Sequence, residues 1–64
     1  MKYYRTENSQ YYFKTDGKTI WQWNTYFSQL GWHNPGTPYI KPWKEYIETE
    51  TIEITEGEVF LALL

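Results

Sequence analysis

The sequence predicts a small α+β fold, in which a three- to four-stranded antiparallel β-meander carries a short C-terminal helix packed on one face. Three observations indicate this class: aromatic-rich runs separated by turn residues, a later run that alternates like a strand, and a helix-capping pattern near the C-terminus. A chain of 64 residues has room for a single domain, residues 1–64. Four Trp, seven Tyr and three Phe supply the apolar mass for its core.

The N-terminal part is expected to form three strands. The runs with strand composition are KYYRT (2–6), QYYFKT (10–15) and KTIWQWN (18–24). Asn8 and Ser9 favour a turn between the first two runs, and Asp16-Gly17 is a strong hairpin signal before the third. These runs therefore predict an antiparallel meander.

The two turns also predict which residues face each other across the strands. A two-residue Asp16-Gly17 loop places Tyr12 opposite Trp21 and Phe13 opposite Ile20. The simplest register of the first hairpin places Tyr4 opposite Phe13.

This register divides the sheet into two different faces. The uncharged face consists of Tyr4, Tyr11, Phe13, Ile20 and Gln22. The other face consists of Tyr3, Arg5, Tyr12, Lys14, Trp21 and Trp23. Because burying Arg5 and Lys14 without partners would be costly, we expect the terminal helix to cover the uncharged face and the indoles to stay partly exposed.

An alternative interpretation keeps Trp21 and Trp23 in the core. Lysine and arginine can lay their alkyl stems over buried rings while their charged groups reach water. A change of one residue in the first turn would also reverse which side chains the first strand presents to each face. Both arrangements of the two indoles are compatible with the sequence.

The middle of the chain is expected to hold one helical turn and one exposed loop. The run TYFSQLGW (25–32) fits about one turn that ends at Gly31, since glycine commonly closes a helix. The run HNPGTP (33–38) predicts a type II turn centred on Pro35-Gly36, in which Pro fixes φ and Gly supplies a positive φ.

The C-terminal part contains two segments with competing interpretations. Behind Pro42, the apolar residues Trp43, Tyr46 and Ile47 have helical spacing. The run TIEIT that follows alternates apolar and polar residues like a strand. We therefore expect a short helical turn or an extended arm at 42–48, followed by a strand at 50–54. Thr55 and Glu58 fit a capping box that predicts a helix at 56–63, and the competing reading makes VFLALL a final strand. The apolar stripe of the helix would be Val59, Phe60, Leu63 and Leu64.

Composition narrows the possible functions. No segment has the pattern of a secretory signal, no apolar run approaches the about 20 residues of a membrane span, and cysteine is absent, so we expect a cytoplasmic protein. His33 is the single histidine, and no metal-ligand spacing, phosphate-binding loop or nucleophile motif accompanies it. We therefore expect a non-enzyme without cofactor or metal, in which His33 is structural or merely exposed.

Charge is distributed unevenly along the chain. Residues 1–32 have a net charge of +2 and residues 33–64 a net charge of −4. The acidic residues of the second half are Glu45, Glu48, Glu50, Glu53, Glu56 and Glu58. They argue against a nucleic-acid partner, because they offer little counterion release. They could steer a basic protein partner, or they could form a solvated face that keeps the protein soluble.

The aromatic hairpin is the candidate binding site. We expect Tyr12, Trp21 and Trp23 to recognise another protein, because Trp, Tyr and Arg are enriched at interface hot spots. The rim of this site would consist of Tyr3, Arg5 and Lys14. The same rings could instead stack on a glycan or on single-stranded nucleic acid. A third reading is a minor virion or assembly component that forms a homo-oligomer.

The two ends of the chain contain the segments KYYRTENSQYYFKTDGKTIWQWN and EITEGEV. Together they resemble short uncharacterised proteins of tailed phages, such as the phages of cyanobacteria. Residues 25–50 lie outside this resemblance, and Gly57 departs from an all-acidic Thr-Glu-Glu-Glu form. The resemblance implies a phage-encoded protein that binds and modulates a host protein in the host cytoplasm, and it implies no catalytic residue.

Overall fold

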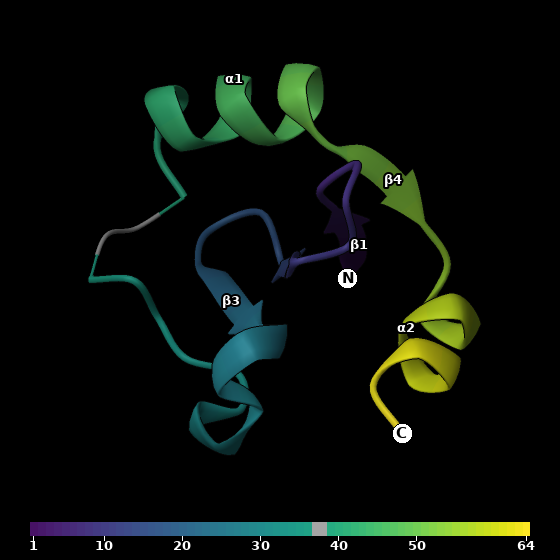
Figure 1. Ribbon diagram of the computed structural model, residues 1–64. Coiled ribbons are helices and arrows are strands. Elements are labelled where there is room, and N and C mark those ends of the chain that lie inside the picture. The colour runs from purple at the N-terminus through teal and green to yellow at the C-terminus, as the bar shows by residue number, and fades with distance from the viewer. Residues whose placement is uncertain (37–38) are drawn as a thin grey trace.

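The computed structural model describes residues 1–36 and 39–64, which form an antiparallel sheet with one helix on each face (Figure 1). The strands are β1 (Lys2–Arg5), β2 (Tyr11–Thr15), β3 (Ile20–Asn24) and β4 (Ile52–Ile54), in the order β3-β2-β1-β4. The helices are the 3₁₀ helix η1 (Thr25–Leu30), α1 (Lys41–Glu50) and α2 (Glu56–Ala62). The predicted α+β class with a C-terminal helix is confirmed, and the final-strand reading of VFLALL is wrong.

The first hairpin has the predicted register. Tyr4 pairs with Phe13 and Arg5 pairs with Tyr12 across β1 and β2. The strand β4 then adds to the free side of β1, with Tyr3 opposite Ile54. The chain therefore returns from α1 to the sheet next to its own N-terminal strand.

The second hairpin differs from the predicted register by two residues. Tyr12 pairs with Trp23 rather than Trp21, and Thr15 pairs with Ile20. The reason is the loop between the strands, in which the Asp16 carboxylate accepts the backbone N–H groups of Lys18 and Thr19, both at 2.9 Å. Since side chains alternate with a period of two, this shift leaves every residue on its predicted face.

The two helices cover opposite faces, and the predicted position of the terminal helix is wrong. On the uncharged face, Ile47 of α1 packs with Tyr4, Phe13 and Ile20, with Trp43 against the same cluster. On the face that carries the indoles, Val59 of α2 packs with Tyr12 and Ile54 of the sheet, and the partly buried residues around this cluster are Tyr3, Trp23, Trp32 and Leu63. The physical reason is that residues 41–50 form a complete helix that occupies the uncharged face.

Each of the two α-helices begins as its local sequence dictates. Pro42 lies in the first turn of α1, where its missing N–H costs no helical hydrogen bond, and Ile47 is only 1% exposed. The helical alternative for residues 42–48 is thus confirmed, but the helix is longer than the predicted turn and continues through Glu50, so the strand predicted at 50–54 is shortened to Ile52–Ile54. At the start of α2, the Thr55 side chain accepts the backbone N–H of Glu58 at 3.2 Å. Of the expected apolar stripe, Val59 is buried and Leu63 half-buried, whereas Phe60 and Leu64 are exposed.

The segment after β3 follows the predicted turn signals. Gly31 closes η1 with a φ of 62° and donates its N–H to the Ser28 carbonyl at 3.0 Å. His33 then pairs with Gln22 through two backbone hydrogen bonds of 2.8 and 3.1 Å, which extends the edge of β3. Gly36 has a φ of 95°, as the third position of a type II turn requires, while residues 37 and 38 of the predicted loop lie outside the described residues.

Candidate functional site

The predicted aromatic platform of Tyr12, Trp21 and Trp23 is mostly covered by the structure. Tyr12 is 6% exposed and packs with Ile54 and Val59 beneath α2. Trp23 packs against the same cluster and meets Trp32 edge to face, with 5.6 Å between ring centroids. Tyr12 therefore belongs to the core, whereas Trp21 and Trp23 are both half-buried, so neither indole is fully in the core or fully exposed.

Lys14, predicted at the rim of the platform, is engaged within the molecule. Its ammonium lies 4.7 Å from the centroid of Trp32 and 5.7 Å from that of Trp21. A cation over an indole face is attracted by the negative face of the ring. This attraction stabilises the Lys14 ammonium on a face that α2 partly covers.

The other two rim residues also have partners in their own chain. The Tyr3 hydroxyl donates to the Glu56 carboxylate at 2.8 Å, and this hydrogen bond, followed by burial and the Glu56 charge, raises the pKa of Tyr3 above its ordinary value. The Arg5 guanidinium donates to the carbonyls of Thr6 and Glu7 at 3.2 and 3.3 Å. Because Arg5 and Lys14 both have partners within the chain, the face that carries them can pack against α2.

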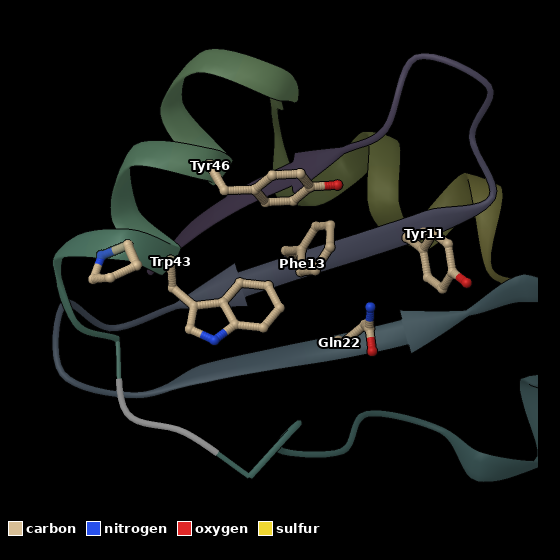
Figure 2. Close-up of a pocket in the computed structure, with 6 residues that line it drawn as sticks. Tyr11, Phe13, Gln22, Trp43 and Tyr46 are labelled. Atoms are coloured by element: carbon tan, nitrogen blue, oxygen red, sulfur yellow. The ribbon is translucent and has the colours of Figure 1, made fainter.

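The opposite face holds an open aromatic pocket between α1 and the strands β2 and β3 (Figure 2). Its volume is about 310 Å³, at the small end of the range for ligand pockets. The lining residues are Tyr11, Phe13, Gln22, Pro42, Trp43 and Tyr46. None of these side chains carries a charge, so an apolar group could enter without desolvating an ion.

Three rings of this aromatic pocket pack at steep angles to one another. The Trp43 and Tyr46 centroids are 6.0 Å apart with 89° between the ring planes. Phe13 lies 6.3 Å from Trp43 and 6.2 Å from Tyr46, and it forms the buried base of the pocket. Ile47, next in sequence to Tyr46, is anchored in the core and so holds both α1 rings over β2. Figure 2 shows the Trp43 and Tyr46 side chains extending from α1 toward Phe13.

Polar groups occur at the rim of the aromatic pocket. In Figure 2 the Tyr46 hydroxyl extends toward Tyr11, and the nitrogen of the Trp43 ring lies on the edge away from Phe13. Within residues 1–36 and 39–64, the side-chain hydrogen bonds do not use the Trp43 N–H or the Tyr11 and Tyr46 hydroxyls. These donors are therefore available to acceptors on a bound molecule.

The charges of α1 are arranged against its own dipole. Lys41 and Lys44 lie near its N-terminus, where anions are favoured, and Glu48 and Glu50 lie in its last turn, where cations are favoured. The one ion pair on the helix joins Lys41 and Glu45 at 3.9 Å between exposed groups and contributes little. The C-terminal end of α1 is thus a region of negative potential.

That negative region extends to neighbouring tyrosines. Burial, followed by the charges of Tyr39, Glu53 and Glu48, raises the pKa of Tyr4 above its ordinary value. Burial and the Glu48 charge likewise raise the pKa of Tyr39. Both hydroxyls are protonated and uncharged at neutral pH, so they add no further negative charge to that of the carboxylates.

Sequence reasoning placed all three strand residues of the aromatic pocket on one face but did not predict a binding site there. Tyr11, Phe13 and Gln22 were placed together on the uncharged face, and that placement is confirmed by the pairing of the strands. Trp43 and Tyr46 were recognised only as a helical spacing. The signal in the sequence was the spacing of Trp43, Tyr46 and Ile47, which places all three on one side of a helix.

No helix in the described part of the chain is long and apolar enough to span a membrane. Within the same residues, no group of three or more His, Cys, Asp or Glu side chains is placed to hold a metal ion. His33 is half-buried, with its Nδ1 at 3.2 Å from the Gly31 carbonyl oxygen.

Comparison with family models, with curated proteins and with solved structures finds no match to this chain. The resemblance of its two ends to phage proteins therefore stays a prediction. The geometry of the aromatic pocket is therefore the basis for the proposed function.

Proposed function

We propose that this protein is a small protein-binding module and that the aromatic pocket is its binding site. The observation that carries the proposal is an open, uncharged pocket walled by Trp43 and Tyr46, whereas Tyr12 and Trp23 of the opposite face pack with α2. Tyr46 is 40% exposed although it belongs to the pocket wall. Trp and Tyr are among the residue types most enriched at interface hot spots.

The shape of the aromatic pocket favours a polypeptide over the other ligand classes. A glycan or a nucleic-acid base stacks best on a flat, open ring, and Trp43 and Tyr46 meet edge to face instead. The carboxylates at the end of α1 further disfavour a phosphate backbone. An apolar side chain of a partner protein fills such a cleft without either difficulty. If the chain is phage-encoded, the partner would be a host protein in the host cytoplasm.

Selection from a random peptide display library tests this function. Peptides selected on the wild-type protein should lose binding to a Tyr46→Ser variant and keep it toward a Tyr26→Ser variant, since Tyr26 is 73% exposed on η1, away from the aromatic pocket. Near-ultraviolet circular dichroism establishes that both variants are folded. If no peptide is enriched, or if every enriched peptide binds Tyr46→Ser unchanged, the proposed function is wrong.

A second candidate function is self-association, as in an assembly component. A pocket lies between η1 and the end of α2, and both helices expose apolar side chains to solvent. The exposed residues are Tyr26, Phe27 and Leu30 on η1 and Phe60, Leu61 and Leu64 on or after α2. Light scattering across protein concentrations would show a stable oligomer that a Leu64→Glu variant, altered at a residue lining this pocket, disrupts. A monomer at every concentration would count against this candidate.

A further inference from the structure

We propose that the aromatic pocket binds a proline-rich segment in the polyproline II conformation, with an arginine or lysine of that segment at the C-terminal end of α1. This inference rests on the proposed function and names the class of partner. It follows from three features: the position of the pocket on the sheet, the groups at its rim, and the charges beside it.

The position of the aromatic pocket excludes recognition by strand addition. The strand β2, which carries Tyr11 and Phe13, is hydrogen-bonded to β1 on one side and to β3 on the other. Its backbone groups are therefore already paired, and Gln22 of the neighbouring edge strand β3 is paired with His33 through two backbone hydrogen bonds. An extended peptide could not join the sheet beside the pocket without displacing His33. A ligand here must be held by side chains lying across the face of the sheet.

The rim of the aromatic pocket favours a segment with free backbone carbonyls. A helical ligand satisfies its own carbonyls and would leave the Trp43 N–H and the Tyr11 and Tyr46 hydroxyls without acceptors. Polyproline II has no internal hydrogen bonds, so each of its carbonyls can accept from a donor of the partner. The polar groups at the rim match this requirement.

The walls of the aromatic pocket favour proline as the inserted side chain. Trp43 and Tyr46 meet at 89°, which leaves a cleft bounded by ring faces and edges. Proline presents a compact apolar ring, and a proline-rich segment is already rigid, so it loses little conformational entropy on docking. A pocket of about 310 Å³ receives one or two such rings rather than a longer apolar surface.

The charges beside the aromatic pocket specify a basic residue in the ligand. Glu50 lies one helical turn beyond Tyr46 on α1, where the helix dipole adds further negative potential. At the opposite end of the pocket, near Pro42, Lys41 and Glu45 pair with each other. A cation on the ligand therefore gains most at the Glu50 end, which also sets the direction of the bound segment.

Nuclear magnetic resonance titration of the ¹⁵N-labelled protein with three synthetic peptides tests this inference. The first peptide is a proline-rich sequence with one arginine at an end, the second has every proline replaced by alanine, and the third has the arginine replaced by glutamate. We expect the first peptide to shift the Trp43 indole N–H and the backbone of Tyr46, with affinity about tenfold higher than either altered peptide. Glu50→Gln should remove the preference for arginine over glutamate, and Glu58→Gln, on α2, should leave it unchanged.

The outcomes separate this inference from the proposed function. If the alanine peptide binds as tightly as the proline peptide, or if shifts occur away from Trp43 and Tyr46, the polyproline class is overturned. The same holds if the proline peptide does not bind. Should library selection still yield apolar peptides that depend on Tyr46, the protein-binding function would stand with another class of partner.

Discussion

The ring of Trp43 meets the ring of Tyr46 edge to face, with 6.0 Å between their centroids. These residues are three apart on α1, so they share one side of the helix. Their burial differs, because Trp43 packs against the core cluster of Phe13 and Ile47 whereas Tyr46 remains 40% exposed. One ring therefore anchors the helix, and the other is positioned to contact a partner.

This difference predicts unequal costs of truncating the two rings. Trp43→Ala should lower the free energy of unfolding by about 3 kcal/mol, since it leaves a cavity above Phe13. Tyr46→Ala removes a partly exposed ring and should cost about 1 kcal/mol. Urea denaturation followed by circular dichroism measures both values. A larger loss for Tyr46→Ala would contradict the roles assigned to the two rings.

The packing of α2 on the face that carries the indoles predicts a second pair of effects. Val59→Ala removes buried methyl groups from the cluster with Tyr12 and Ile54, and it should cost about 1.5 kcal/mol. Leu61 lies two residues away on the same helix but is 76% exposed, so Leu61→Ala should change stability by about 0.5 kcal/mol or less. Val59→Ala should also change the fluorescence of Trp23. Equal effects of the two substitutions would mean that α2 does not pack in this orientation.

The position of Lys14 between two indoles predicts a loss that depends on its charge. Lys14→Met keeps the alkyl stem and removes the ammonium from Trp21 and Trp32, which should cost about 0.5–1 kcal/mol. Lys18→Met, in the exposed hairpin loop, is the matched control and should be nearly neutral. Thermal denaturation of both variants at equal ionic strength gives the comparison. The interpretation fails if the two variants are equally stable.

Asp16 predicts a specific acid sensitivity of the second hairpin. Hydrogen bonds from the backbone N–H groups of Thr19 and Lys18 hold the pKa of its carboxyl below the ordinary value of 3.8. A depressed pKa in the folded state contributes stability that is present above the unfolded value and is lost as pH falls through the folded value. Asp16→Asn keeps an acceptor oxygen without the titration, so its stability should change less than that of wild type across this acidic range. A thermal-denaturation series at decreasing pH checks the difference, and parallel curves for the two proteins would refute it.

Alkaline pH should weaken the contact between β1 and α2. The pKa of Tyr3 is raised, chiefly because its hydroxyl donates to Glu56, so the protonated form is favoured in the folded state. Its contribution is complete below the ordinary tyrosine value of 10.0 and is lost as pH rises through the higher folded value. Tyr3→Phe should remove this part of the alkaline dependence, while Tyr26→Phe, on the exposed part of η1, should retain it. Spectrophotometric titration combined with denaturation distinguishes these outcomes.

Local rules were sufficient where the interacting residues are close in the chain. The turn at Asn8 and Ser9 determines the pairing of β1 with β2, and Thr55 caps α2 as its sequence pattern indicates. The second hairpin shows the limit of these rules, because bonds from Lys18 and Thr19 to Asp16 select a longer loop than the Asp16-Gly17 signal implies. The register error had no effect on the faces, since a shift of two residues preserves the alternation.

The sequence by itself determined the composition of the two sheet faces, the capping pattern that begins the C-terminal helix and the uneven charge along the chain. Only the tertiary structure decided that α1 covers the uncharged face and that α2 covers Tyr12 and Trp23. The aromatic pocket likewise arises only when α1 brings Trp43 and Tyr46 over Phe13, a residue far from them in the chain. The physical reason is that local alternation and capping depend on neighbouring residues, whereas the choice between two apolar faces depends on the surface that distant elements bury together.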